Sequence, residues 1–119
     1  MKIGEVQALL EAKIWVGEEK KELEVYAACG SDLMSDVLAF VKDRVLLLTG
    51  LVNPQVIRTA EMMDIKAIVF VRGKEPTQDI LDLAKNKNMI ILSTDYPMYL
   101  SCGLLYLNGL KDEEQADEA

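Results

Sequence analysis

The sequence predicts an α/β fold: a small layered domain with a mainly parallel sheet of three βα units, preceded by an N-terminal helix and a strand pair. Three short runs, "VLLL", "AIVFV" and "MIIL", are continuously apolar, as is typical of strands covered on both faces of a parallel sheet. Each run is followed by a turn and an amphipathic helix pattern. The predicted strand ends, Thr49, Arg72 and Ser93, are 23 and 21 residues apart, so the βα unit is effectively repeated.

The N-terminal elements are expected to be a helix and two strands. In "IGEVQALLEA", residues Val6, Leu9 and Leu10 share one helical face. The segment "KIWVGEEKKELEVYAA" predicts a short strand, a turn at Gly17 and a second strand. We expect a hairpin-like pair whose second strand is half-exposed, near a sheet edge and antiparallel to its neighbour. Its inward residues are predicted to be Leu23, Val25 and Ala27.

A helix is predicted in "CGSDLMSDVLAFVKD", with its capping signal at Ser31 or Asp32. Asp32 and Asp36 lie four residues apart on one face of this helix, so they could share a Mg²⁺ ion. The alternative is that they interact favourably with the helix dipole, as acids in a first turn usually do. The predicted inward residues are Leu33, Val37, Leu38 and Val41.

Two amphipathic helices follow the first two parallel strands. Asn53 is a good N-cap, and Pro54 occupies the first helical position, where its missing N–H removes no hydrogen bond. Pro76 and Thr77 open the second of these helices. The predicted buried residues are Val56, Ile57, Ala60 and Met63 in the first helix, and Ile80, Leu81 and Ala84 in the second.

The last helix follows Pro97 and is predicted to be mostly buried, because it is apolar along most of its length. Asn108-Gly109 ends it. The domain is predicted to span residues 1–110. Residues 111–119, "KDEEQADEA", are predicted to form a disordered acidic tail, since no aromatic or β-branched residue is present to bury surface. The predicted inward residues of the helix are Met98, Leu100, Cys102, Leu105 and Leu107.

Length and composition limit the classes of function. A chain of 119 residues is one domain, and its formal charge of -7 argues against DNA or RNA as the main partner. The longest apolar runs are five or six residues, which predicts no membrane span, and the N-terminus has no secretory signal pattern. We therefore expect a cytoplasmic protein.

The absence of histidine argues against an enzyme, because it removes every Cys-His or Ser-His arrangement. Cys102 lies in an apolar helix stripe and is most simply a buried small hydrophobe. Cys29, beside Gly30 in a predicted loop, is the better candidate for a reactive thiol. We predict no catalytic residue, no metal ligand and no bound cofactor.

The edge formed by the strand C-termini is the predicted ligand site, because open α/β sheets bind ligands there. Glycines after two of the strands let the backbone approach a ligand, Arg72 supplies a guanidinium, and helix N-termini supply unpaired N–H groups. Together these groups suit a phosphate or carboxylate. The competing interpretation is that the same residues are only turns and caps. The predicted ligand-binding residues are Thr49, Gly50, Asn53, Arg72, Gly73, Lys74, Ser93 and Thr94.

Residues 46–109 resemble the DRTGG domain family in several turn motifs that recur in order. A strand ends in Thr49-Gly50, a second ends in the Gly-x-x-Pro turn from Gly73 to Pro76, and a third ends in "STDY" before the last helix. The Asp-Arg-Thr-Gly-Gly string itself is absent, since "LVNP" follows Thr49-Gly50.

The resemblance implies a regulatory module similar to the N-terminal domain of HPr kinase/phosphorylase and to the DRTGG module of CBS-domain pyrophosphatases. Such modules are often dimeric, and some contact adenine nucleotides. The segment "ACGSDLMSDVLAF" is similar to a stand-alone branch found in anaerobic bacteria near iron–sulfur and iron hydrogenase genes. The sequence contains no phosphate-loop motif of the kinase catalytic domain, so we expect no kinase activity from this chain.

We therefore expect a non-catalytic regulatory or sensor domain. It is predicted to bind a nucleotide, such as an adenine nucleotide, or a similar anion at the C-terminal edge of the parallel strands, and to work as a homodimer. The alternative is an interaction or assembly protein associated with an iron–sulfur or hydrogenase system, with no small ligand.

Overall fold

A five-stranded sheet forms the centre of the domain in the computed structural model, which describes residues 1–40 and 44–111. The strand order is β1-β5-β4-β3-β2. Strands β2 to β5 run parallel, and β1 lies antiparallel to β5 at one edge. The strands are β1 (Lys13–Val16), β2 (Ala27–Gly30), β3 (Val45–Thr49), β4 (Ala67–Phe70) and β5 (Ile90–Ser93).

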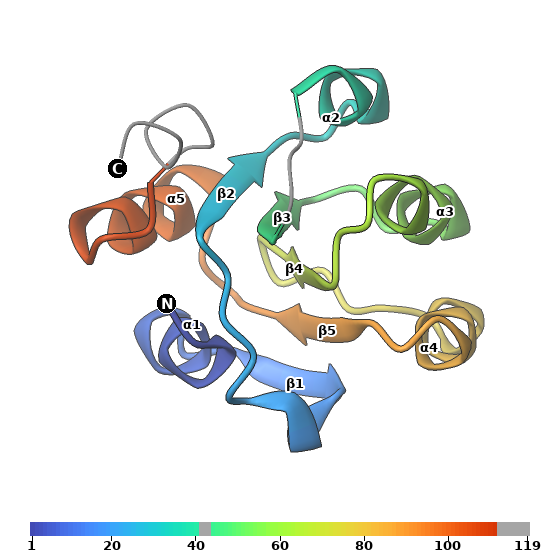
Figure 1. The fold of residues 1–119 in the computed structure, drawn as a ribbon, viewed down its shortest axis with the longest axis horizontal. Helices are drawn as coiled ribbons and strands as arrows, with labels where there is room; N and C mark the ends of the chain where they lie inside the picture. The colour runs from blue at the N-terminus through green and yellow to red at the C-terminus, as the bar shows by residue number, and fades with distance from the viewer. Residues whose placement is uncertain (41–43, 112–119) are drawn as a thin grey trace.

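Helices cover both faces of the sheet (Figure 1). Helices α1 and α5 lie on one face, and α2, α3 and α4 lie on the other. A short 3₁₀ helix, η1, follows β1. The helical bounds are α1 (Ile3–Leu10), η1 (Glu18–Lys20), α2 (Met34–Phe40), α3 (Pro54–Met62), α4 (Gln78–Asn86) and α5 (Met98–Leu107).

The central strands are buried on both faces, which confirms the prediction made from their continuous apolar runs. Successive side chains point to opposite faces, so Leu46 and Leu48 pack with α1 and α5, whereas Leu47 packs with the other helices. The α/β fold with a mainly parallel sheet is as predicted.

The predicted hairpin-like strand pair is wrong. β1 and β2 lie at opposite edges of the sheet, and β2 is parallel to β3. The intervening segment does alternate inward and outward, with Val25 buried and Leu23 partly buried. Its hydrogen-bond partner is the N-terminus of the chain: the Ile3 N–H donates to the Leu23 carbonyl, and the Val25 N–H donates to the Met1 carbonyl.

The prediction for α2 is right only in part. Val37 is buried, whereas Leu33 and Leu38 are exposed, and Val41 lies outside the described residues. The helix begins at Met34, so Leu33 precedes it. Ser31 does not cap the helix; its hydroxyl oxygen accepts the Leu33 N–H at 3.0 Å in a local turn.

Helices α3 and α4 follow the sequence closely. The Asn53 side chain caps α3 by accepting the Val56 N–H at 3.3 Å, and Pro54 is its first residue. Thr77 is the N-cap residue of α4. The predicted inward residues Val56, Ile57, Ala60, Ile80 and Ala84 are buried, and Met63 and Leu81 are partly buried.

Helix α5 is not mostly buried, contrary to expectation. Leu105 is buried, and Met98 and Cys102 are partly buried, but Leu100 and Leu107 are exposed. A single helix on the side of the sheet buries one stripe, however apolar its other faces are. The helix does end at the predicted place, since Asn108 is its C-cap residue and Gly109 has a φ of 106°.

The chain ends beside β2. Lys111, which we assigned to the tail, accepts the Ala28 N–H through its carbonyl at 3.0 Å. The remaining residues of the predicted tail, 112–119, lie outside the described part of the chain. Among residues 1–40 and 44–111, no helix has the length and apolar character needed to cross a membrane. The cytoplasmic location remains a prediction.

Candidate functional site

The C-terminal ends of the three central parallel strands lie side by side. Thr49 of β3 is in register with Phe70 of β4, which is in register with Ser93 of β5. The segments that follow these strands therefore begin at the same edge of the sheet. This arrangement brings most of the predicted ligand-binding residues into one region of the molecule.

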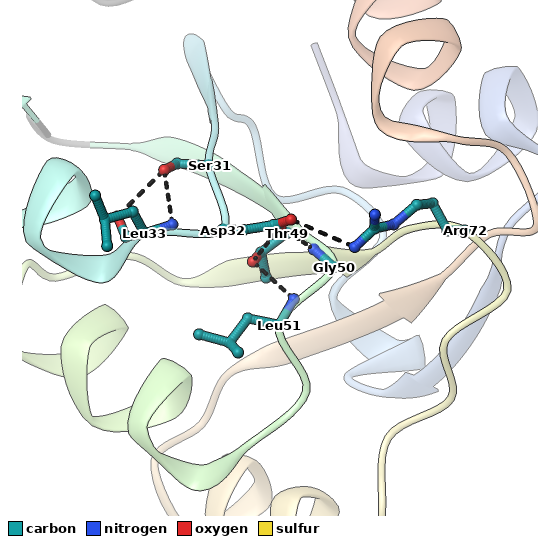
Figure 2. Close-up of polar contacts among 7 residues, drawn as sticks. All are labelled: Ser31, Asp32, Leu33, Thr49, Gly50, Leu51 and Arg72. Carbon is teal, nitrogen blue, oxygen red and sulfur yellow. Dashed lines mark hydrogen bonds and ion pairs between the residues drawn. The ribbon is translucent and has the colours of Figure 1, made fainter.

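Asp32 occupies the centre of this region, between β3 and the segment after β4 (Figure 2). Its Oδ1 atom accepts the Gly50 N–H at 2.6 Å and the Thr49 hydroxyl at 3.3 Å. Its Oδ2 atom lies 3.3 Å from Nη2 of Arg72. A carboxylate is thus held by an N–H, a hydroxyl and a guanidinium. We call Asp32, Thr49, Gly50 and Arg72 the carboxylate cradle.

Arg72 reaches the cradle from an unusual backbone conformation. Its φ is 62°, in the left-handed region, and its N–H donates to the Tyr96 carbonyl at 2.8 Å. The guanidinium then lies directly against Gly50. A Cβ atom at position 50 would come within 2.2 Å of Arg72 Nη2. Gly50 is therefore required for close approach of the arginine side chain.

The Arg72–Asp32 ion pair is accessible to solvent. The arginine side chain is 50% exposed and the aspartate side chain 51% exposed. Ion pairs at such positions contribute about 0–1 kcal/mol to stability, because water screens the charges. The pair can therefore exchange partners at small energetic cost.

Gly73 and Lys74 extend the same edge. Gly73 has a φ of 71°, which favours glycine, and its N–H donates to the Thr94 carbonyl at 2.9 Å. Lys74 is exposed, and its backbone N–H donates to the Val71 carbonyl at 3.3 Å. The lysine ammonium is therefore available as a second cation close in sequence to Arg72.

The hydroxyls of Ser93 and Thr94 are used within the domain. The Ser93 Oγ accepts the Trp15 indole N–H at 2.8 Å. The Thr94 Oγ1 donates to the Leu10 carbonyl at 2.7 Å and accepts the Tyr96 N–H at 3.2 Å. Thr94 is buried. Both hydroxyls therefore connect β5 to neighbouring elements.

The cradle includes one residue that the sequence prediction missed. The sequence suggests three roles for Asp32: a helix cap, a helix-dipole acid, or half of a magnesium pair with Asp36. In the structure Asp32 lies two residues before α2 and points to the end of β3 and to Arg72, which follows β4. No group of three or more His, Cys, Asp or Glu that could hold a metal ion occurs in the described part of the chain. The available signal in the sequence was an acid two residues after the strand that ends at Gly30.

The two cysteines are both partly buried and lie on different elements. Cys29 is within β2 and packs against the layer of α2, α3 and α4, so it is not in a loop as predicted. Cys102 packs on the opposite face, where a Cβ atom at Gly30 would come within 2.9 Å of its Sγ. Burial raises the pKa of the Cys102 thiol above its usual value.

The fold is similar to a solved structure of the regulatory region of a pyrophosphatase. It aligns with the crystal structure of the CBS and DRTGG domains of the regulatory region of Clostridium perfringens pyrophosphatase, complexed with the activator diadenosine tetraphosphate. The TM-score is 0.74 at 15% sequence identity, over 95% of this chain and 49% of the other. The chain thus spans about half the length of that structure.

The family assignment comes from the sequence match. A search of curated protein sequences finds no match. The family model of the DRTGG domain matches residues 5–105, which is most of the 119-residue chain. The turn motifs and the fold agree with that match, and the chain belongs to the DRTGG domain family.

Proposed function

We propose that the chain is a regulatory domain in which an anionic nucleotide competes with the Asp32 carboxylate for its cradle. The observation that supports this most strongly is the cradle itself. An N–H, a hydroxyl and a guanidinium converge on one carboxylate, and these are the groups that bind a phosphate oxygen. Asp32 then acts as an internal anion that a ligand displaces.

The geometry also suggests how binding is transmitted. Asp32 lies two residues before α2, so loss of its contacts with Gly50 and Arg72 releases the start of that helix from β3 and β4. Lys74 is exposed at the same edge and can neutralise further phosphate charge. Nucleotide binding would thus change the position of α2, which a partner protein or domain can detect.

The first test is thermal unfolding of the full chain with AMP, ATP, GTP and diadenosine tetraphosphate. A ligand present at about 100 times its dissociation constant stabilises the fold by roughly 2.7 kcal/mol. For a domain of this size that corresponds to a shift in Tm on the order of 10 °C. No shift with any of these nucleotides at millimolar concentration would refute the proposed ligand class.

Two variants separate the role of the cradle from general charge effects. Arg72→Gln removes the guanidinium and should abolish the nucleotide-induced shift. Arg44→Gln is the matched control, because Arg44 also has a left-handed backbone (φ 57°) but precedes β3, at the opposite end of that strand. An equal loss of nucleotide binding in both variants would indicate nonspecific attraction to positive charge.

Asp32→Asn tests the competition directly. Asparagine can still accept the Gly50 N–H, but it carries no charge to hold Arg72. Removing a half-exposed ion pair worth up to 1 kcal/mol should tighten nucleotide binding by up to about fivefold. Weaker binding in this variant, measured by calorimetric titration, would mean that Asp32 is a ligand-binding residue and not a competitor.

A second candidate function is an interaction or assembly protein for an iron–sulfur or hydrogenase system, with no small ligand. The observation that leaves room for it is that Ser93 and Thr94, two predicted ligand-binding residues, use their hydroxyls in hydrogen bonds within the domain, which weighs against the ligand site. The discriminating experiment is affinity capture from native extract. Recovery of an identified iron–sulfur protein at stoichiometric level, together with no thermal shift by nucleotides, would favour this second function.

A further inference from the structure

Two leucines border the carboxylate cradle. Leu33 directly follows Asp32 in the chain, and Leu51 directly follows Gly50. In Figure 2 both leucine side chains lie on the side of the Asp32 carboxylate that is opposite to Arg72. Leu33 is 58% exposed, whereas Leu51 is partly buried and packs against the core beneath α2, α3 and α4. We call Leu33 and Leu51 the leucine pair.

Hydrogen bonds fix the backbone of both leucines. The Ser31 hydroxyl accepts the Leu33 N–H at 3.0 Å and lies 3.2 Å from the Leu33 carbonyl oxygen, to which it donates. The Thr49 Oγ1 accepts the Leu51 N–H at 3.1 Å. None of these hydrogen bonds uses the carboxylate of the cradle. An anion that displaces this carboxylate therefore leaves them intact.

The opposite side of the cradle is charged. Lys74 is exposed there, next to Gly73. A Cβ atom at Gly73 would lie 3.5 Å from Oδ1 of Asp95, so a carboxylate also stands on this side. Covering charged groups with an apolar part of a ligand costs free energy, because the groups lose water without gaining a partner. The surface around the cradle therefore favours placing an apolar group over the leucine pair.

We propose that the leucine pair contacts the base of a nucleotide whose phosphates occupy the cradle. This inference rests on the proposed function and specifies which part of the ligand lies beside the phosphates. The flat face of a base gains free energy when it leaves water for an aliphatic surface. Leucine side chains have no hydrogen-bonding group, so they do not read the edge of the base. The site thus distinguishes nucleotides from inorganic phosphates, but adenine from guanine only weakly.

Calorimetric titration of the full chain with ATP, GTP and tripolyphosphate tests this inference. Tripolyphosphate has the phosphate chain of ATP without ribose or base. Covering about half of one leucine side chain should make ATP bind about tenfold more tightly than tripolyphosphate, and ATP and GTP should agree within about threefold. Equal affinity for ATP and tripolyphosphate would overturn this inference and leave the proposed function standing. No binding of any of the three would overturn both.

A matched pair of variants locates the contact. Leu33→Ala should weaken ATP binding about fivefold and leave tripolyphosphate binding unchanged, because it removes apolar surface and no charge. Leu38→Ala should change neither affinity: Leu38 is also exposed, at 44%, but it lies within α2 and is not adjacent to any cradle residue in the chain. Circular dichroism checks that both variants fold. Equal weakening of ATP and tripolyphosphate by Leu33→Ala, or no weakening of ATP, would refute the contact with the base.

Discussion

Replacing Thr94 with valine should destabilise the domain although the two side chains have nearly the same shape. Thr94 is 3% exposed, and its hydroxyl is hydrogen-bonded to two backbone groups: the Leu10 carbonyl at the end of α1 and the Tyr96 N–H. Valine removes both hydrogen bonds and leaves those groups without this partner. Each such loss costs about 1–3 kcal/mol, so the two together should lower the free energy of unfolding by about 2–6 kcal/mol.

Urea denaturation monitored by fluorescence of Trp15, the single tryptophan, measures this loss. The midpoint should fall by on the order of 2 M if the slope is typical of a small domain. Thr94→Ser is the control, because it keeps the hydroxyl and should cost about 1 kcal/mol or less. A free energy of unfolding of Thr94→Val within about 0.5 kcal/mol of that of the original protein would contradict this. In that case the Thr94 hydrogen bonds do not stabilise the contact between α1 and the end of β5, and the reasoning is wrong.

Three further predictions concern other parts of the domain. Gly17→Ala should cost more than about 2 kcal/mol in urea denaturation, because φ is 92° and a Cβ atom would come within 2.8 Å of Ile90 Cγ1. Tyr96 donates its hydroxyl to the Glu11 carboxylate, which raises the tyrosine pKa, so this contribution to stability is present below the unfolded pKa and is lost as pH rises through the folded pKa. Tyr96→Phe should therefore show a smaller loss of stability at alkaline pH. Alkylation of Cys102 by iodoacetamide should be slow at neutral pH and faster at higher pH, as followed by mass spectrometry, since burial raises its pKa.

The parallel sheet could be predicted because its evidence is local. Each of the three central strands is a continuous apolar run, and each is followed by a helix with its own start signal, such as Asn53-Pro54. Runs of four or five apolar residues are too short for a typical helix, and strands covered on both faces have this pattern. Chain connectivity then places the three strand ends at one edge.

The arrangement of the N-terminal strands could not be predicted from alternation alone. Alternation shows that one side of the 22–27 segment is buried, but it does not identify the partner. Val25 is buried as expected, yet its backbone pairs with Met1, and the next residues join β3 in parallel. The choice between hairpin and crossover depends on contacts with distant parts of the chain.

The exposed face of α5 and the contacts of Asp32 also depend on distant parts of the chain, so local sequence patterns could not predict them. Ten consecutive helical residues that are almost all apolar do not indicate which face has no neighbour, so the exposure of Tyr99 and Leu107 required the structure. Asp32 precedes a helix in sequence and therefore had a sufficient local explanation as a dipole acid. Its contacts with Gly50 and Arg72 span 18 and 40 residues, a separation that spacing patterns do not record.

The most direct measurement of the proposed competition is an amide NMR titration with diadenosine tetraphosphate, ATP and inorganic phosphate. We expect the largest shifts at the Gly50 N–H, which loses the Asp32 carboxylate, and at Arg72 and Gly73, with smaller shifts at the start of α2. Arg72→Gln should remove these shifts. Saturable shifts confined to other surfaces, or no shifts at millimolar nucleotide, would contradict the account in which a ligand anion takes the place of Asp32.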